Sequence, residues 1–236
     1  MVYHCIGIDE MKREKEIVLN AVRQYGYVLQ FASDELKNDE DVVLTAVRQD
    51  GGALDSASEE LKNDKEVVLT AVRKVGNALR YSSNELRNDR EVVLEAVRQD
   101  GHALQYAGDM MKGDQEVVLE AIKHGGHLKY ASRDLLHDKQ FLLQVVEYDV
   151  NLNHLPEEIS NDKEFLLQVI KLMLEAVKNN GFALYYASKE LQKDRELVME
   201  ALKCNGYVFE YSDELYQARM HYCYHDVYLG NAVEHH

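Results

Sequence analysis

The chain has 236 residues and carries 27 lysines and arginines against 42 aspartates and glutamates, a formal net charge of −15. A charge of this sign disfavours a nucleic-acid backbone or an anionic membrane surface as the main partner. It serves solubility first, and a basic protein partner remains open. We therefore expect no nucleic acid and no membrane among the partners.

Cysteine usage and hydropathy indicate the compartment. The three cysteines, Cys5, Cys204 and Cys223, are scattered and lack the spacing of a zinc site, as in proteins of reducing compartments. The N-terminus has no apolar signal-peptide core, and no apolar run approaches about eighteen residues. These features predict a cytoplasmic protein.

One pattern of about 25 residues recurs from residue 14 to 215, after an expected N-terminal cap at 1–13. Its copies open on Glu14, Asp39, Asp64, Asp89, Asp114, Asp138, Asp162 and Asp194. A glycine follows most openings by twelve residues, at Gly26, Gly51, Gly76, Gly101, Gly126 and Gly206. Such a period indicates stacked repeats, so we expect a single array over 1–236. Residues 216–231 are expected to form a C-terminal cap, and 232–236 resemble the remnant of a purification tag.

A single repeat, residues 64–88, predicts two helical parts. Asp64 is a good N-cap for a helix with a valine-rich apolar stripe. Gly76 is expected to end that helix in the left-handed conformation. The rest predicts one or two short helical turns, α or 3₁₀, with Ser83 as a further cap, since no run alternates with the period of a strand. The predicted fold is all-α, an α-solenoid of about eight repeats.

Four repeats depart from the pattern. The second has small residues at Gly51-Gly52 and Asp55-Ser56, which predict a local dip in the surface. The fifth loses one residue. The sixth has Val150 in place of the glycine and Pro156 in place of the capping serine, and Pro is acceptable at a helix start. The seventh has nineteen residues before Gly181, which predict a longer helix or a step in the stack.

Columns of equivalent positions separate core from surface. An aromatic column is expected in the core: Phe31, Tyr81, Tyr106, Tyr130, Tyr186 and Tyr211. A first variable column follows the glycine: Tyr27, Gly52, Asn77, His102, His127, Asn151, Phe182 and Tyr207. A second lies two or three residues on: Gln30, Asp55, Arg80, Gln105, Lys129, Asn153, Tyr185 and Glu210. Large residues at exposed turns are typical of protein interfaces, which predicts a protein-binding surface at Tyr27, His102, His127, Phe182, Tyr185 and Tyr207.

A basic series recurs near the helix ends: Arg23, Arg48, Arg73, Arg98, Lys123, Lys178 and Lys203. Clamping a phosphate polymer is one interpretation. The favoured one is compensation of the helix dipole, or pairing with the acidic series two turns earlier on the same helices: Glu16, Asp41, Glu66, Glu91, Glu116, Glu164 and Glu196.

Histidines supply weak metal candidates. His102, His124 and His127 are close enough in the repeat to converge, and His221 and His225 lie one helical turn apart. Two ligands do not close a metal site, and no phosphate-binding loop or hydrolase motif is present in the sequence. We therefore predict no catalytic residues, no cofactor and no enzymatic activity, with a metal-dependent activity as the remote alternative.

The recurring elements D-x-E-V-V-L-x-A-V-R, the glycine and A-L-x-Y-A-S-x-E-L-K-N-D stand in their fullest form between Asp64 and Asp114. They resemble the repeat family described as domain of unknown function 4116, found in intracellular bacteria and single-celled eukaryotes. The resemblance weakens across 138–181 and ends after Leu215. It implies no catalytic residues, and it implies that some relatives are modules of pathogen effectors.

These observations lead to one hypothesis and one alternative. The hypothesis is a non-catalytic helical-repeat scaffold that mediates protein–protein interaction. The alternative is a regulatory or targeting domain of a larger bacterial effector or enzyme, which would act inside a host cell.

Overall fold

The structure is a computed structural model that describes residues 14–148, 154–175 and 193–196. Its contacts divide the chain into two compact units, Met1–Ser132 and Arg133–His236. The regular structure of the described residues is all helical, with no strand among them. The expectation that both units belong to one continuous array stays a prediction.

The first four repeats each have a long helix, a 3₁₀ helix and a short third turn, as predicted, and the fifth has its long helix and 3₁₀ helix within the first unit. The long helices are residues 14–24, α3 (Glu40–Gln49), α4 (Lys65–Lys74), α5 (Arg90–Gln99) and α7 (Gln115–Lys123). The 3₁₀ helices are η1 (Gly26–Phe31), η2 (Gly51–Ser56), η4 (Gly76–Tyr81), η6 (Gly101–Tyr106) and η7 (Leu128–Tyr130). The third turns are α2 (Asp34–Lys37), η3 (Leu61–Asn63), η5 (Leu86–Asn88) and α6 (Asp109–Lys112).

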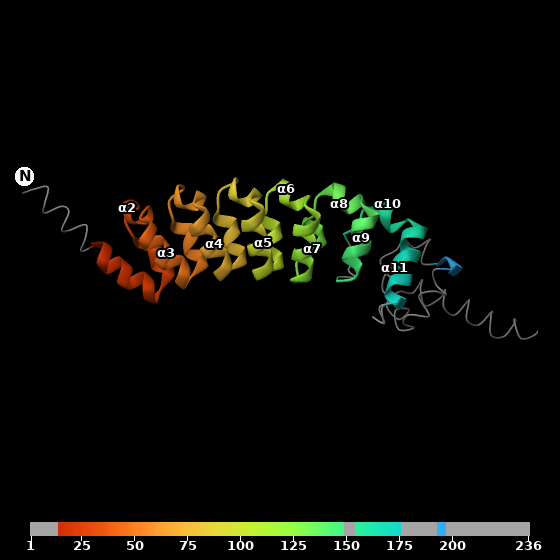
Figure 1. Cartoon of the computed structure of the whole chain (residues 1–236), viewed down its shortest axis with the longest axis horizontal. Helices are drawn as coiled ribbons and strands as arrows, with labels where there is room; N and C mark the ends of the chain where they lie inside the picture. Colours follow the sequence, from red (N-terminus) through yellow and green to blue (C-terminus); the bar gives the residue numbers. More distant parts are fainter. Residues whose placement is uncertain (1–13, 149–153, 176–192, 197–236) are drawn as a thin grey trace, which may run out of the picture. The chain divides into compact units, whose positions relative to one another are not determined.

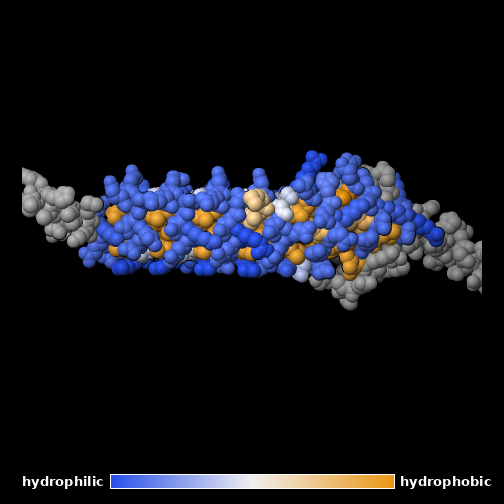
Figure 2. Space-filling view, turned by 45° about the horizontal axis from the view of Figure 1, so that its top comes forward, coloured by the Kyte–Doolittle hydropathy of each residue, from blue (hydrophilic) through white to orange (hydrophobic). Residues whose placement is uncertain are grey.

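Equivalent helices of the first unit lie side by side in two layers (Figure 1). In one layer α3 packs against α4, α4 against α5 and α5 against α7, and in the other η1 packs against η2, η2 against η4 and η4 against η6. Valines, alanines and fully buried leucines fill the space between the layers. The face of the first unit seen in Figure 2 is mainly hydrophilic, with small apolar spots at regular intervals. Burying these apolar side chains between neighbouring repeats is the main stabilising contribution.

The second unit contains α8 (Arg133–His137), α9 (Lys139–Val146), α10 (Glu157–Ser160) and α11 (Lys163–Glu175). Helix α9 packs against α11, and Phe141 and Phe165 are fully buried. Pro156 immediately precedes α10, as expected for a proline at a helix start. The 13 residues of α11 exceed the 10 of α5, in agreement with the predicted longer helix. Val150 and Gly181 lie outside the described residues.

The predicted caps are confirmed. The Asp64 carboxylate accepts a hydrogen bond of 3.0 Å from the Val67 N–H at the start of α4. The same contact opens the helices that follow Asp39, Asp89, Asp114, Asp138 and Asp162. The Ser83 hydroxyl accepts from the Leu86 N–H at 3.2 Å and so caps its short turn. Capping aspartates therefore fix where each long helix begins.

The repeated glycine has a different role from the one predicted. Gly76 does not end α4 in the left-handed conformation; it begins η4. Among the described residues only Gly125 has a positive φ, of 81°. A Cβ on Gly76 would collide with the carbonyl oxygen of Ala96 in the next repeat and lie 2.9 Å from the Asp100 nitrogen. Glycine is therefore required for close approach between repeats, which explains its recurrence better than backbone conformation does.

The aromatic column is not core, contrary to prediction. Phe31 is 77 % exposed, and Tyr81, Tyr106 and Tyr130 are only partly buried. The interior position of each 3₁₀ helix is already filled by a fully buried leucine two residues earlier, at Leu29, Leu54, Leu79, Leu104 and Leu128. The aromatic rings therefore lie at the surface of this layer. Tyr186 and Tyr211 fall outside the described residues.

Ion pairs join the starts of successive long helices. The Lys65 Nζ lies 2.8 Å from the Asp89 carboxylate and 2.9 Å from that of Glu91 in the next repeat. Lys15 bridges Asp39 and Asp41 in the same way, as Arg90 bridges Asp114 and Glu116. We call each such contact a cap joint, because one carboxylate both caps its own helix and accepts from the previous repeat.

Ion pairs between repeats lower the pKa of four carboxylates, those of Asp89, Asp114, Glu120 and Asp162. Partial burial raises the pKa of Asp89, but hydrogen bonds from Lys65 and from the Val92 N–H outweigh this and hold it below its usual value. The hydrogen bond from Lys139 lowers the pKa of Asp162, and the hydrogen bond from Arg98 lowers that of Glu120. The ionised forms of all four are therefore favoured by folding.

Replacing Gly76 with alanine should lower the free energy of unfolding by about 3 kcal/mol, because the added methyl group meets backbone of the next repeat. Chemical denaturation followed by circular dichroism measures this. Gly113→Ala is the matched control, since its Cβ would find no atom closer than 3.5 Å. Gly125→Ala tests the left-handed conformation alone and should cost about 1–2 kcal/mol. Equal stability of Gly76→Ala and Gly113→Ala would contradict the close-approach argument.

Acid should destabilise the fold through the cap joints. The lowered pKa values of Asp89, Asp114 and Asp162 contribute stability that is fully present above the ordinary Asp value of 3.8 and is lost as the pH falls through the folded values. The melting temperature should stay level from about pH 7 to 5 and fall below about pH 4. Asp89→Asn should reduce this acid dependence, and Asp55→Asn, at an exposed carboxylate outside the joints, should retain it. A melting temperature at pH 3 equal to that at pH 7 would refute the argument.

Candidate functional site

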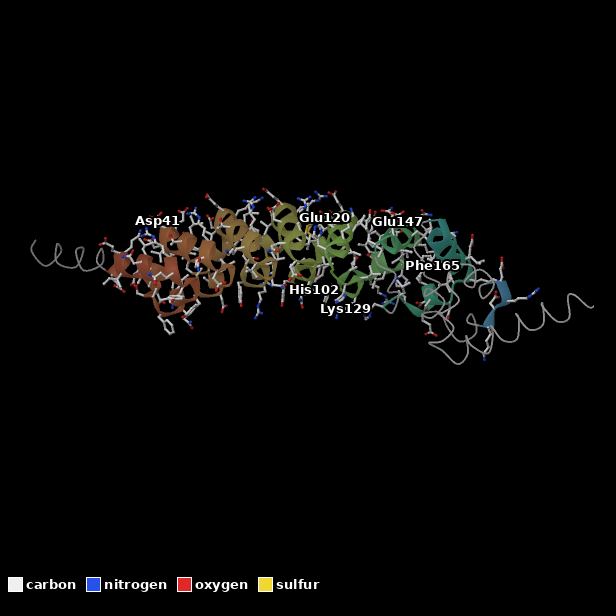
Figure 3. The ribbon with its side chains drawn as sticks, turned by 90° about the horizontal axis from the view of Figure 1, so that it is seen from below. Asp41, His102, Glu120, Lys129, Glu147 and Phe165 are labelled. Atoms are coloured by element: carbon white, nitrogen blue, oxygen red, sulfur yellow. The ribbon has the colours of Figure 1, made fainter. Side chains whose placement is uncertain are left out.

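The first variable column lies along one edge of the first unit. It consists of Tyr27, Gly52, Asn77, His102 and His127, each the second residue of a 3₁₀ helix or the residue before it. His102 and Lys129 lie at one edge, and Asp41 and Glu120 on the long helices lie at the opposite edge (Figure 3). The packing of each repeat on the next sets the spacing of this column, while the side chains in the column differ from repeat to repeat.

His102 and His127 are brought together, as predicted. Their ring centroids are 4.8 Å apart and the ring planes are nearly perpendicular, at 89°. Asp100 orients His102 twice: one carboxylate oxygen accepts from the His102 backbone N–H at 3.0 Å and lies 3.0 Å from Nδ1 of the ring. His124 does not join them, because its Nδ1 lies 2.9 Å from the Glu120 carbonyl oxygen of its own helix.

Aromatic rings gather at the start of the same column. Tyr25 and Tyr27 are 56 % and 55 % exposed, with ring centroids 6.0 Å apart. Exposed Phe31 lies on the same 3₁₀ helix as Tyr27. Sequence reasoning missed Tyr25, although the equivalent positions hold Asp50, Val75 and Asp100 and so showed an unusual residue there. These rings offer the amphipathic contact area that protein interfaces favour.

The second variable column supports the first. Gln30 and Gln105 donate side-chain hydrogen bonds to the carbonyl oxygens of Tyr27 and His102, at 3.2 and 3.1 Å. Arg80 lies over the rings of Tyr81 and Tyr106, 4.8 and 5.9 Å from their centroids. Such cation–π contacts hold long side chains in place. Contacts made by the second column therefore restrict the conformations available to the residues of the first column and its neighbours.

Five candidate residues lie outside the described residues: Phe182, Tyr185, Tyr207, His221 and His225. Their roles stay predictions. Within the described ranges no group of three or more His, Cys, Asp or Glu side chains could hold a metal ion. No helix in these ranges is both long and apolar enough to cross a membrane.

Two members of the basic series, Arg73 and Arg98, are paired, though not with the predicted partners. Arg73 Nε lies 2.9 Å from a Glu95 carboxylate oxygen, and Arg98 Nε lies 3.1 Å from one of Glu120, each in the next repeat. Arg98 also lies 3.7 Å from Glu95 on its own helix, whereas the acidic residues Glu91 and Glu116 take part in cap joints. Pairing is therefore confirmed for Arg73 and Arg98, and the choice of partners was wrong because it considered each helix alone.

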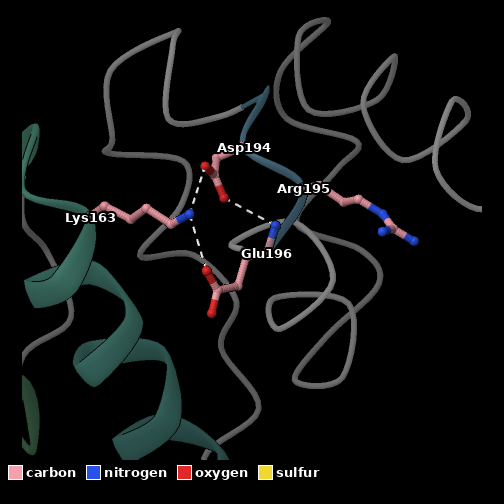
Figure 4. Close-up of a pocket in the computed structure, with 4 residues that line it drawn as sticks. All are labelled: Lys163, Asp194, Arg195 and Glu196. Carbon is pink, nitrogen blue, oxygen red and sulfur yellow. Dashed lines mark hydrogen bonds and ion pairs between the residues drawn. The ribbon is translucent and has the colours of Figure 1, made fainter.

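A hollow of about 410 Å³ in the second unit is lined by Lys163, Asp194, Arg195 and Glu196. Lys163 Nζ lies 2.9 Å from Asp194 and 3.1 Å from Glu196, whose backbone N–H donates to Asp194 (Figure 4). This arrangement repeats the cap joint of Lys65, Asp89 and Glu91. Three of the residues that line the hollow, Lys163, Asp194 and Glu196, are thus engaged in a structural contact.

Comparison with protein families identifies the repeat. The model of a domain of unknown function, DUF4116, matches four segments: residues 14–62, 64–112, 114–152 and 171–217. Neither a search of curated proteins nor a search of solved structures returned a match. The family model covers well over half of the sequence and follows the repeats that the structure displays. The chain therefore belongs to the DUF4116 family of repeated helical domains.

Proposed function

We propose that the protein is a non-catalytic helical-repeat scaffold that binds another protein through the first variable column. The observation that carries this is the position of the rings at the two ends of the described column: exposed Tyr27 at one end, and the His102–His127 pair, which begins three repeats further on, at the other. Interfaces are enriched in aromatic side chains, and a few of these carry most of the binding energy.

The proposed architecture is an α-solenoid of about eight repeats. Packing of each repeat on the next, and the recurrence of family segments to residue 217, support it. Such an array presents side chains at a spacing close to that of packed helices, about 8–10 Å. A long partner segment could therefore contact several repeats at once, each adding a small contribution.

The chemistry of the column favours a protein partner. Tyrosine and imidazole rings combine apolar faces with hydrogen-bonding groups, and Asp100 holds His102 in one orientation. Restricting these side chains before binding reduces the entropy lost on association. The net charge of −15 favours a partner surface that is neutral or basic over most of the interface.

The test begins with affinity capture from the native cell and identification of the partner by mass spectrometry. The partner is then purified and its affinity measured for the wild type and for the variant Tyr27→Ala/His102→Ala/His127→Ala. We expect the triple variant to bind at least about tenfold more weakly, since truncating interface anchors costs about 2 kcal/mol or more.

The matched control is Glu66→Ala/Lys74→Ala, which removes one charge of each sign from exposed positions of α4. It should bind like the wild type. Circular dichroism is used to check that both variants are folded. Unchanged affinity of the triple variant would refute the proposed surface, and a partner that is chemically converted by the protein would refute the non-catalytic role.

A further inference from the structure

The basic series divides into two parts. One turn before each cation on its own helix stand Asn20, Thr45, Thr70, Glu95 and Glu120. Arg73 and Arg98 contact the carboxylates of Glu95 and Glu120, 22 residues further along the chain. At the same offset of 22 residues, Arg23 and Arg48 have the hydroxyl-bearing residues Thr45 and Thr70 instead of a carboxylate. Among the described residues neither of these two arginines lies within ion-pair distance of a carboxylate.

A surface groove of about 400 Å³ lies at this point, lined by Arg23, Thr45, Arg48 and Gln49. The polar groups around it are partly engaged. Arg23 donates to the Asn20 side chain at 3.2 Å, Thr45 donates to the Asp41 carbonyl at 2.6 Å, and Gln49 donates to the Gln24 carbonyl at 3.2 Å. None of these acceptors carries a formal charge, so both guanidinium charges remain uncompensated by the described side chains.

Dipole compensation does not account for this difference. A helix C-terminus carries about half a negative charge, which favours a cation but compensates only about half of a guanidinium charge. The same dipole acts on Arg73 and Arg98, which nevertheless have carboxylate partners. The first two repeats thus differ from the next two in lacking the anion, and the groove is where an anion would lie.

We propose that this groove binds an oxyanion carried by a partner protein segment, either a phosphorylated side chain or a pair of carboxylates. Guanidinium groups form paired hydrogen bonds with both. The proposal deepens the proposed function, since it assumes that the partner is a protein. Gln49, which lines the groove, donates to the Gln24 carbonyl. The next residue is Tyr25, whose exposed ring lies 6.0 Å from that of Tyr27 in the first variable column.

A long polyanion fits less well. The unpaired arginines span only one interval between helices, about 8–10 Å. Beyond them Glu95 neutralises Arg73, and the cap joints hold further carboxylates. A nucleic acid presents charge continuously and would meet these carboxylates. A short segment with one or two anionic groups matches the extent of the positive groove.

The test titrates the full chain with four probes at low ionic strength, followed by NMR of the arginine side-chain N–H signals. The probes are a ten-residue Gly/Ser/Ala peptide with one phosphoserine, the same peptide with two glutamates, inorganic phosphate, and a twenty-nucleotide single-stranded DNA. We expect the anionic peptides to shift the Arg23 and Arg48 signals, to bind more tightly than phosphate or DNA, and to weaken as salt is added.

The decisive variant is Thr45→Glu/Thr70→Glu, which places carboxylates where Glu95 and Glu120 stand in later repeats. It should fold at least as stably as the wild type and bind the anionic peptides roughly tenfold more weakly. Arg23→Gln/Arg48→Gln should have the same effect, while the matched control Arg73→Gln, at a paired arginine, should not. Glu95→Thr should release Arg73 and strengthen binding.

Several outcomes overturn the proposal. They are no shift at either arginine, equal binding by wild type and Thr45→Glu/Thr70→Glu, phosphate binding as tight as the peptides, or tighter binding of DNA. None of these readouts involves Tyr27, His102 or His127. Failure of the groove can therefore be told apart from failure of the proposed interaction surface.

Discussion

The structure depends on one close approach between neighbouring repeats. In η1, η2, η4 and η6 the opening glycine lies against the alanine carbonyl in the last turn of the next long helix, as Gly26 lies against Ala46 and Gly76 against Ala96. The same Ala46 oxygen accepts from the Asp50 N–H at 2.8 Å. There is no room for a Cβ at these glycines, so the distance between repeats is fixed by backbone and tolerates little variation. Apolar burial supplies the stability, and this contact supplies the spacing.

Fixed spacing lets polar contacts recur at constant sequence offsets. Lys65 meets Asp89 24 residues on, and Lys139 meets Asp162 23 residues on, within a repeat one residue shorter. Lys163 meets Asp194 across 31 residues, so the extra residues of the seventh repeat leave the cap joint intact. Because these joints fix the starts of the long helices, side chains on the opposite edge can vary without disturbing the frame. That freedom is what makes the first variable column a plausible recognition surface.

Local patterns were predictable from the sequence and contacts between repeats were not. Asp64 as a cap, the valine-rich helix and the short turns follow from chemistry within one repeat, and all are observed. Gly76 was misread because a glycine after a helix fits a left-handed end equally well; only the neighbouring Ala96 reveals its steric role. The recurring Tyr81 was placed in the core because periodicity cannot distinguish a half-buried column from a buried one. Arg73 was assigned a partner on its own helix, whereas its partner lies one repeat away.

The contacts between repeats matter for function because they decide which surface charges are neutralised. A chain of net charge −15 would repel anions if its charge were spread evenly. A protein nevertheless recognises ligands through local electrostatic fields, which extend about 8 Å at physiological salt. Glu95 and Glu120 cancel the arginines they face, and Thr45 and Thr70 do not, so a change of one side chain per repeat turns a structural ion pair into an available cation. In a repeat protein the frame is constant, and such single positions are therefore where one repeat acquires a chemistry that its neighbours lack.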